Sequence, residues 1–244
     1  MSVDHAPLVV IFDVFGTLLC PQSGGEEKFL DVIAGLGFER TFADLSRLQS
    51  YCDATTHTEE SLNRENYLRW TDGALQAIST AGAIGALEQH LAALVPALEQ
   101  WHQVPMEPYP DVRSSLSAIR AAGTKVVTCS NWGWDLDVDL RAAGVADIID
   151  GVYTSARIGS RKPHPDIYRR VLSECSVIAG DALFVGDSVH TDVLGPRAVG
   201  ISSLHLDRTA PSDLGRGRIA SLDEILPWCQ NSDWRRFAST VEAR

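Results

Sequence analysis

Three features that would assign the chain to a class at once are missing from the sequence: a long apolar run, a surplus of basic residues and closely paired cysteines. No stretch approaches the ~20 consecutive apolar residues of a membrane-spanning helix. The N-terminus shows no charged segment followed by a long apolar core, which a secretory signal would have. We therefore expect a cytoplasmic protein that does not engage a membrane.

Acidic residues outnumber basic ones, with 32 Asp and Glu against 21 Lys and Arg and a net charge of −11. This balance argues against DNA or RNA as a partner, because a nucleic-acid-binding surface needs clustered basic side chains. The five cysteines are widely spaced and form no CxxC pair. We expect them to be free thiols in a reducing compartment.

What the sequence does contain is an alternation of two patterns over most of its 244 residues. Short apolar runs predict buried strands at residues 8–12, 125–129, 151–154, 182–185 and 201–206. Helical spacing, often closed by a glycine, predicts helices at residues 111–122, 136–143, 165–174 and 192–199. Strands that alternate with helices predict an α/β fold, with a parallel sheet covered by helices on both faces.

Residues 21–104 interrupt this alternation, because they contain no convincing strand. Helical patterns occur there at residues 26–36, 42–54, 61–78 and 84–101, and Gly and Pro residues flank the stretch in the manner of hinges. We therefore predict an all-helical insertion over residues 21–104, inside a core formed by residues 1–20 and 105–244. The polar tail from residue 227 is compatible with either a short helix or a frayed end.

The first predicted strand ends on Asp13. In open α/β sheets the ligand lies beyond the carboxyl ends of the strands, so Asp13 belongs to the edge where chemistry is expected. Its carboxylate can act as a covalent nucleophile. Gly16 permits a tight turn directly afterwards, and the Thr17 hydroxyl can hydrogen-bond within that turn.

Three further segments place polar residues at the same edge. Ser130 and Asn131 end the second strand, where a hydroxyl and backbone N–H groups can hold an oxygen of a substrate or cap the next helix. Lys162 precedes the helix predicted at 165–174 and can balance the charge of a nucleophile and an anion. Asp187 and Asp192 follow the fourth strand, and paired carboxylates are suitable ligands for Mg²⁺. Each signal is modest alone, but their common position favours one shared site.

On these segments the sequence resembles the haloacid dehalogenase (HAD) superfamily. The resemblance covers residues 8–19 and 108–226, and residues 128–200 are most similar to the haloacid dehalogenase-like hydrolase domain-containing proteins. The motifs that carry it are FDVFGTL at 12–18, TCSN at 128–131, RKPHPDIY at 161–168 and GDSVHTD at 186–192. It implies a Rossmann-like core with a helical cap that closes over the cleft.

The resemblance also implies roles for individual residues. Asp13 would be the nucleophile, and Ser130 and Lys162 would hold the transferring group. Mg²⁺ would be bound by Asp13, the backbone carbonyl of Phe15 and Asp187, and Asp192 would support the metal or its waters.

A small anionic substrate is expected to contact Thr17, Asn131 and Trp132. Trp132 would form an aromatic wall of the pocket or pack between core and cap. The sequence contains no motif that identifies the substrate. The chain could be a monomer or a homodimer.

Phe15 departs from the pattern of the family's phosphatases, which usually carry a second Asp there to protonate the leaving alcohol. Phe cannot transfer a proton, and loss of a general acid typically costs ~10²–10⁴ in rate for a poor leaving group. We favour a Mg²⁺-dependent hydrolase of a small phosphorylated metabolite, acting through an aspartyl-phosphate on Asp13. An activated substrate, a water or another side chain would then compensate for the missing acid.

Two alternatives stay open. The 2-haloacid dehalogenases of the superfamily carry an aromatic residue at the position of Phe15, form an aspartyl ester without a metal, and bind the halide with a cap arginine, for which Arg47 or Arg40 is available. They lack the Asp187 and Asp192 pair, whose charges would repel Asp13 unless a cation were bound. The remaining alternative is a weakly active member with a regulatory or binding role.

Overall fold

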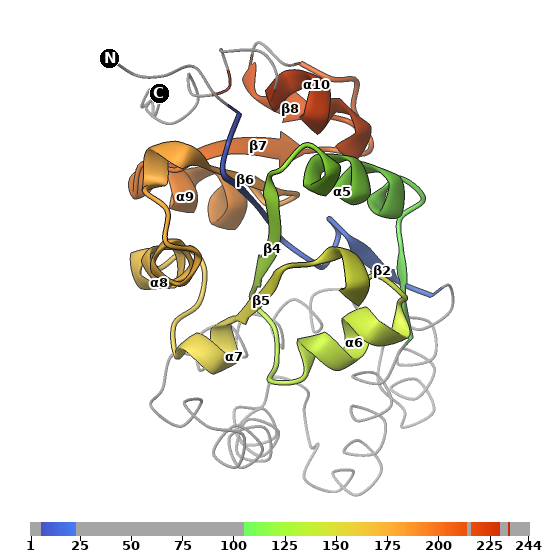
Figure 1. Ribbon diagram of the computed structural model, residues 1–244, viewed down its shortest axis with the longest axis horizontal. Coiled ribbons are helices and arrows are strands. Elements are labelled where there is room, and N and C mark those ends of the chain that lie inside the picture. Colours follow the sequence, from blue (N-terminus) through green and yellow to red (C-terminus); the bar gives the residue numbers. More distant parts are fainter. Residues whose placement is uncertain (1–5, 23–104, 214–215, 230–233, 235–244) are drawn as a thin grey trace, which may run out of the picture. The chain divides into compact units, whose positions relative to one another are not determined.

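The computed structural model describes residues 6–22, 105–213, 216–229 and 234 (Figure 1). The chain divides into two compact units, one formed by residues 1–20 and 108–244 and the other by residues 21–107. Apart from residues 21 and 22, the predicted insertion at 21–104 lies outside the described residues. Its helical content therefore stays a prediction.

The first unit is built on a six-stranded sheet with the order β5-β4-β1-β6-β7-β8, in which every neighbouring pair is parallel. The prediction of a parallel α/β sheet is confirmed, and each of the five predicted strands agrees within one residue at either end. The strands are β1 (Val9–Phe12), β4 (Lys125–Ser130), β5 (Gly151–Thr154), β6 (Ala182–Gly186), β7 (Ser202–Leu206) and β8 (Arg218–Ile219).

Two further strands, β2 (Leu19–Pro21) and β3 (Met106–Pro108), form a separate two-stranded sheet. Neither was expected, because each has three residues and contains a proline, which interrupts a strand pattern. These strands occupy the positions in the chain where it leaves and re-enters the first unit.

Helices cover both faces of the large sheet (Figure 1). Val9 and Ile11 share one buried cluster with side chains of α8. Val10 and Phe12 alternate with them and so face the other side of the sheet, and there α5 packs on β4. The helices are α5 (Val112–Ala121), α6 (Leu136–Ala142), α7 (Ser155–Ile158), α8 (Pro165–Cys175), α9 (Gly195–Ala198) and α10 (Ile225–Cys229).

Short helical turns complete the unit: the 3₁₀ turns η3 (Ala146–Ile148), η4 (Ala179–Asp181) and η7 (Leu222–Glu224), and the π turn η5 (Val189–Leu194). The segment predicted as a helix at 192–199 is helical over most of its length, but it is not one regular helix, because it is divided between η5 and α9. The physical reason is Pro196, which has no N–H to donate to the carbonyl of Asp192. The wide turn that results is a form found often at functional sites.

Within the described ranges, no helix has both the length and the apolar character needed to span a membrane. Cys129, Cys175 and Cys229 are buried and none of them forms a disulfide.

The buried face of α6 gives a direct test of the packing. Leu140 is fully buried, whereas Val138 on the same helix is 50% exposed. Leu140→Ala should lower the free energy of unfolding by about 2–5 kcal/mol, because it leaves a cavity. Val138→Ala is the matched control and should change it by less than about 0.5 kcal/mol. Urea denaturation measures both, and equal effects would contradict the assigned orientation of α6.

Candidate active site

The site is assembled by the register of three adjacent strands. Phe12, the last residue of β1, pairs with Thr128 of β4 on one side and Val185 of β6 on the other. The N–H of Asp13 donates to the carbonyl of Val185 at 2.9 Å. Because the three strands are parallel, the residues that follow them gather at one edge of the sheet.

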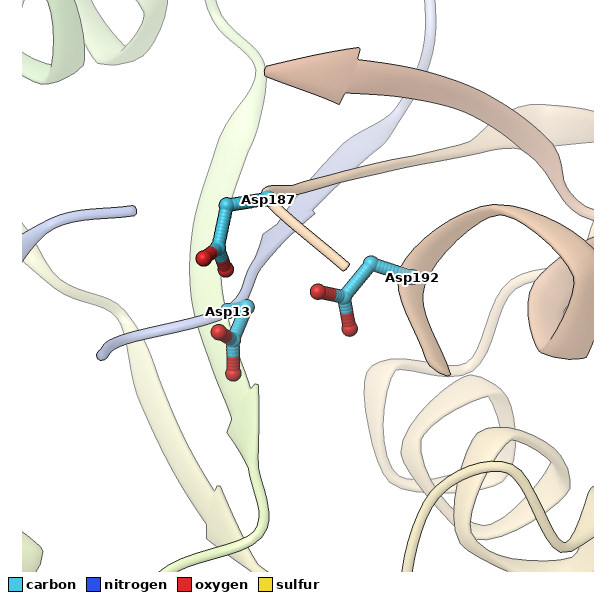
Figure 2. Close-up of side chains that lie close together, drawn as sticks. All are labelled: Asp13, Asp187 and Asp192. Carbon is cyan, nitrogen blue, oxygen red and sulfur yellow. The ribbon is translucent and has the colours of Figure 1, made fainter. Parts of the chain in front are cut away.

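Three carboxylates meet at this edge, those of Asp13 after β1, Asp187 after β6 and Asp192 in η5 (Figure 2). One oxygen of each lies within 4.8 Å of those of the other two. Asp13 and Asp192 are buried, and Asp187 is exposed. Such a group of hard oxygen donors suits a divalent cation such as Mg²⁺.

Asp13 is held by the two residues predicted to act with it. The Ser130 hydroxyl donates to Oδ1 of Asp13 at 2.8 Å, and Nζ of Lys162 donates to the same oxygen at 2.7 Å. All three side chains are buried. Both donors therefore bind Oδ1, and neither of them binds Oδ2.

Lys162 also binds Asp192, so it bridges two carboxylates. Its Nζ donates to Oδ1 of Asp192 at 2.6 Å and lies 5.3 Å from the centre of the Phe184 ring. Asp192 is fully buried and accepts two more hydrogen bonds, from the Thr191 hydroxyl on Oδ1 and from the Ser188 N–H on Oδ2. With both oxygens engaged, Asp192 is better suited to hold Lys162 than to bind a cation directly.

The pKa shifts agree with a charged cluster. Burial by itself would lower the pKa of Lys162, but the charges of Asp13 and Asp192 outweigh it and raise that pKa above its ordinary value. Burial raises the pKa of Asp192 to about 6, although Lys162 opposes the shift. Burial and then the charge of Asp13 raise the pKa of Asp187. Lys162 is therefore cationic at neutral pH, and a further cation would stabilise ionised Asp187.

Asp187 is oriented by the loop that follows Asp13. The Thr17 hydroxyl donates to Oδ1 of Asp187 at 3.3 Å and accepts from the Asp187 N–H at 3.1 Å. Gly16 has φ of +76°, and a Cβ there would lie 2.3 Å from Oδ2 of Asp187. Only glycine satisfies both the left-handed backbone and this close approach.

Asn131 and Trp132, both expected to contact substrate, have partners within the protein. The Asn131 amide donates to the backbone carbonyl of Lys162 at 2.9 Å and accepts from the Lys162 N–H at 2.8 Å. Asn131 therefore fixes the backbone that presents the ammonium. Trp132 is half-buried and donates through Nε1 to Asp139 at 2.9 Å, which fixes the orientation of its ring.

The remaining expectations concern Phe15 and two arginines of the predicted insertion. Phe15 is 51% exposed. Arg47 and Arg40 lie outside the described residues.

The role of Thr191 was missed, because a hydroxyl beside an aspartate gives no signal in one sequence. Gly186 could have been found, since a glycine between a strand and an aspartate indicates a close backbone approach.

These features define a hydrolase in which a buried carboxylate, an ammonium and an acidic cluster meet at the edge of a parallel sheet. The model of the family described as "haloacid dehalogenase-like hydrolase" matches residues 8–200, and the chain therefore belongs to this family. The prediction made from the four motifs is confirmed.

Individual relatives fit the same assignment. The chain is 27% identical to the haloacid dehalogenase-like hydrolase domain-containing protein 3 of Mus musculus, over 80% of this chain and 77% of the relative. It is 25% identical to a glyceraldehyde 3-phosphate phosphatase of Methanopyrus kandleri, over 84% and 86% of the two chains. The 2-haloacid dehalogenase of Pseudomonas syringae has the same fold, with a TM-score of 0.62, 20% identity and coverage of 91% and 96%.

Gly186 allows the packing of the site to be tested. A Cβ at this position would lie 2.4 Å from Cγ of Asp192, whereas a Cβ at Gly180 would meet no atom within 4 Å. Gly186→Ala should displace Asp192 from Lys162 and cost about 1–3 kcal/mol of stability, as overpacking does. Gly180→Ala, the control, should have little effect. Thermal unfolding and a crystal structure of each variant measure this, and an unmoved Asp192 would count against the geometry.

Proposed function

We propose that the chain is a Mg²⁺-dependent hydrolase of a small phosphorylated metabolite. The observation that carries this proposal is the group of three carboxylates within 4.8 Å of one another, one of which is held by a hydroxyl and an ammonium. One ammonium cannot neutralise three carboxylates, so a divalent cation suits the site electrostatically. The phosphatase relative lends independent support.

The chain's own residues account for the steps of such a reaction. Asp13 attacks phosphorus through a carboxylate oxygen, the bond to the leaving oxygen breaks, and an aspartyl-phosphate forms. The leaving oxygen takes its proton from water, because Phe15 has none to give. Water then attacks this phosphorus, which releases inorganic phosphate and restores Asp13. Ser130 and Lys162 hold the phosphoryl oxygens and offset their charge during both steps.

Asp13, Asp187 and the backbone carbonyl of Phe15 would hold the cation. A bound Mg²⁺ would supply positive charge that lessens repulsion between the substrate and the acidic cluster. Asp192 would act indirectly, by fixing the ammonium of Lys162 at 2.6 Å.

A second function is favoured by Phe15. Its exposed aromatic side chain cannot protonate a leaving alcohol, and a halide ion needs no proton. A metal-independent 2-haloacid dehalogenase, acting through an aspartyl ester on Asp13, is therefore the competing proposal. A weakly active member with a binding role is the remaining one.

Substitution of Asp13 tests the covalent step that both catalytic proposals share. Asp13→Asn keeps the size of the side chain but removes the charge, so turnover should fall to the level of the blank. The measurement is a screen of phosphate esters, acyl phosphates and 2-haloacids, each with and without Mg²⁺. Phosphate release that needs Mg²⁺ supports the phosphatase, and halide release without metal supports the dehalogenase. Activity that survives in Asp13→Asn would refute the nucleophile, and no activity in the native chain would favour a binding role.

Restoring an acid tests the interpretation of Phe15. Phe15→Asp should raise the hydrolysis of simple alkyl phosphates by about 10²-fold, since general acid catalysis contributes at least this much for poor leaving groups. Hydrolysis of 4-nitrophenyl phosphate should change far less, because its leaving group is already stable as an anion. Phe15→Leu is the control and should give no gain. An Asp variant no faster than the Leu variant would show that the acid is not limiting.

A further inference from the structure

Arg208 lies outside the acidic cluster but contacts the loop that orients it. This residue follows β7, and its Nη2 donates to the backbone carbonyl of Thr17 at 2.9 Å. The hydroxyl of the same Thr17 makes both hydrogen bonds to Asp187. A continuous set of contacts therefore runs from the guanidinium of Arg208 through Thr17 to the Asp187 carboxylate.

Arg208 is itself firmly held. Its guanidinium binds the Asp111 carboxylate in a two-point contact, with Nη1 to Oδ2 at 2.8 Å and Nη2 to Oδ1 at 3.0 Å. It also lies 4.0 Å from the centre of the Tyr109 ring. Two-point contacts of this kind are directional as well as strong, and lysine cannot reproduce them. The contact with Asp111 therefore fixes the direction in which Nη2 of Arg208 points toward the carbonyl of Thr17.

Asp111 is anchored in turn to the segment after β8. Its Oδ2 accepts from the Ser221 hydroxyl at 3.0 Å and from the Leu222 N–H at 2.9 Å. Burial alone would raise the pKa of Asp111, but the hydrogen bonds from Arg208 and Leu222 outweigh it and lower that pKa. Asp111 is therefore ionised at neutral pH, which favours its contact with the guanidinium of Arg208.

We propose that Arg208 is a positioning residue for Asp187. It fixes the backbone of Thr17, whose hydroxyl holds the Asp187 carboxylate in the direction required for a cation. In this way Arg208 sets the affinity of the site for Mg²⁺ without touching the metal or the substrate. This inference rests on the proposed function only in naming Mg²⁺ as the cation.

Calorimetric titration of Mg²⁺ into the full chain, without substrate, tests the proposal. Arg208→Gln should weaken binding by about 10-fold or more, as the loss of a residue that orients a metal ligand typically does. Arg208→Lys should recover only part of this loss, because it retains the charge without the planar fork. Native affinity in Arg208→Gln would overturn the proposal.

Arg113 supplies a matched control. It is an exposed arginine of α5 that also binds an aspartate, Asp147, and a backbone carbonyl, that of Gly144. Its contacts do not involve the Thr17 loop, so Arg113→Gln should leave Mg²⁺ affinity unchanged. An equal loss in both variants would mean a general effect of losing an arginine–aspartate pair and would overturn the positioning role.

A double-mutant cycle tests whether Arg208 acts through Thr17. If it does, Thr17→Val combined with Arg208→Gln should weaken Mg²⁺ binding by less than the product of the single effects. Losses that multiply would mean independent action and would overturn the proposal.

A crystal structure of Arg208→Gln separates this inference from the proposed function. If the native chain binds no Mg²⁺, the metal-dependent function fails, yet the structure still decides the role of Arg208. A displaced Thr17 hydroxyl with a reoriented Asp187 would support positioning. An unchanged Thr17 and Asp187 would refute it.

Discussion

The structure of the site depends on one buried ammonium, that of Lys162, between the carboxylates of Asp13 and Asp192. Both carboxylates are largely removed from water, and two such charges together would favour protonation of one of them. Lys162 contacts them at 2.7 and 2.6 Å. A buried ion pair repays its desolvation only when its other polar atoms are also satisfied. Ser130 provides a further hydrogen bond to Oδ1 of Asp13, and Ser188 and Thr191 provide hydrogen bonds to both oxygens of Asp192.

Lys162 and Ser130 both donate to Oδ1 of Asp13, so the orientation of this carboxylate is fixed. The backbone of Lys162 is held in turn by Asn131, whose side-chain amide hydrogen-bonds to both the N–H and the carbonyl of Lys162. Asp187 stands apart from this buried group, exposed to solvent and oriented by Thr17. The site thus combines a buried, hydrogen-bonded pair of carboxylates with one carboxylate that is exposed to solvent.

Much of the core was predictable because its signals are local. Apolar runs such as residues 8–12 end directly on Asp13, and the parallel register then brings Ser130, Lys162 and Asp187 together. The split of the segment after Asp192 was missed, although Pro196 was visible, because helical spacing alone does not count backbone donors. The contact of Arg208 with Thr17 was not predictable, since 191 positions separate the two residues. Neither side chain carries a motif that indicates the other.

Every described group of the site, from Asp13 to Asp192, belongs to the same one of the two compact units. The balance between these acids and the ammonium of Lys162 is therefore maintained by contacts within that unit. Over evolution, this placement allows the charge balance of the site to be inherited together with the packing of a single unit.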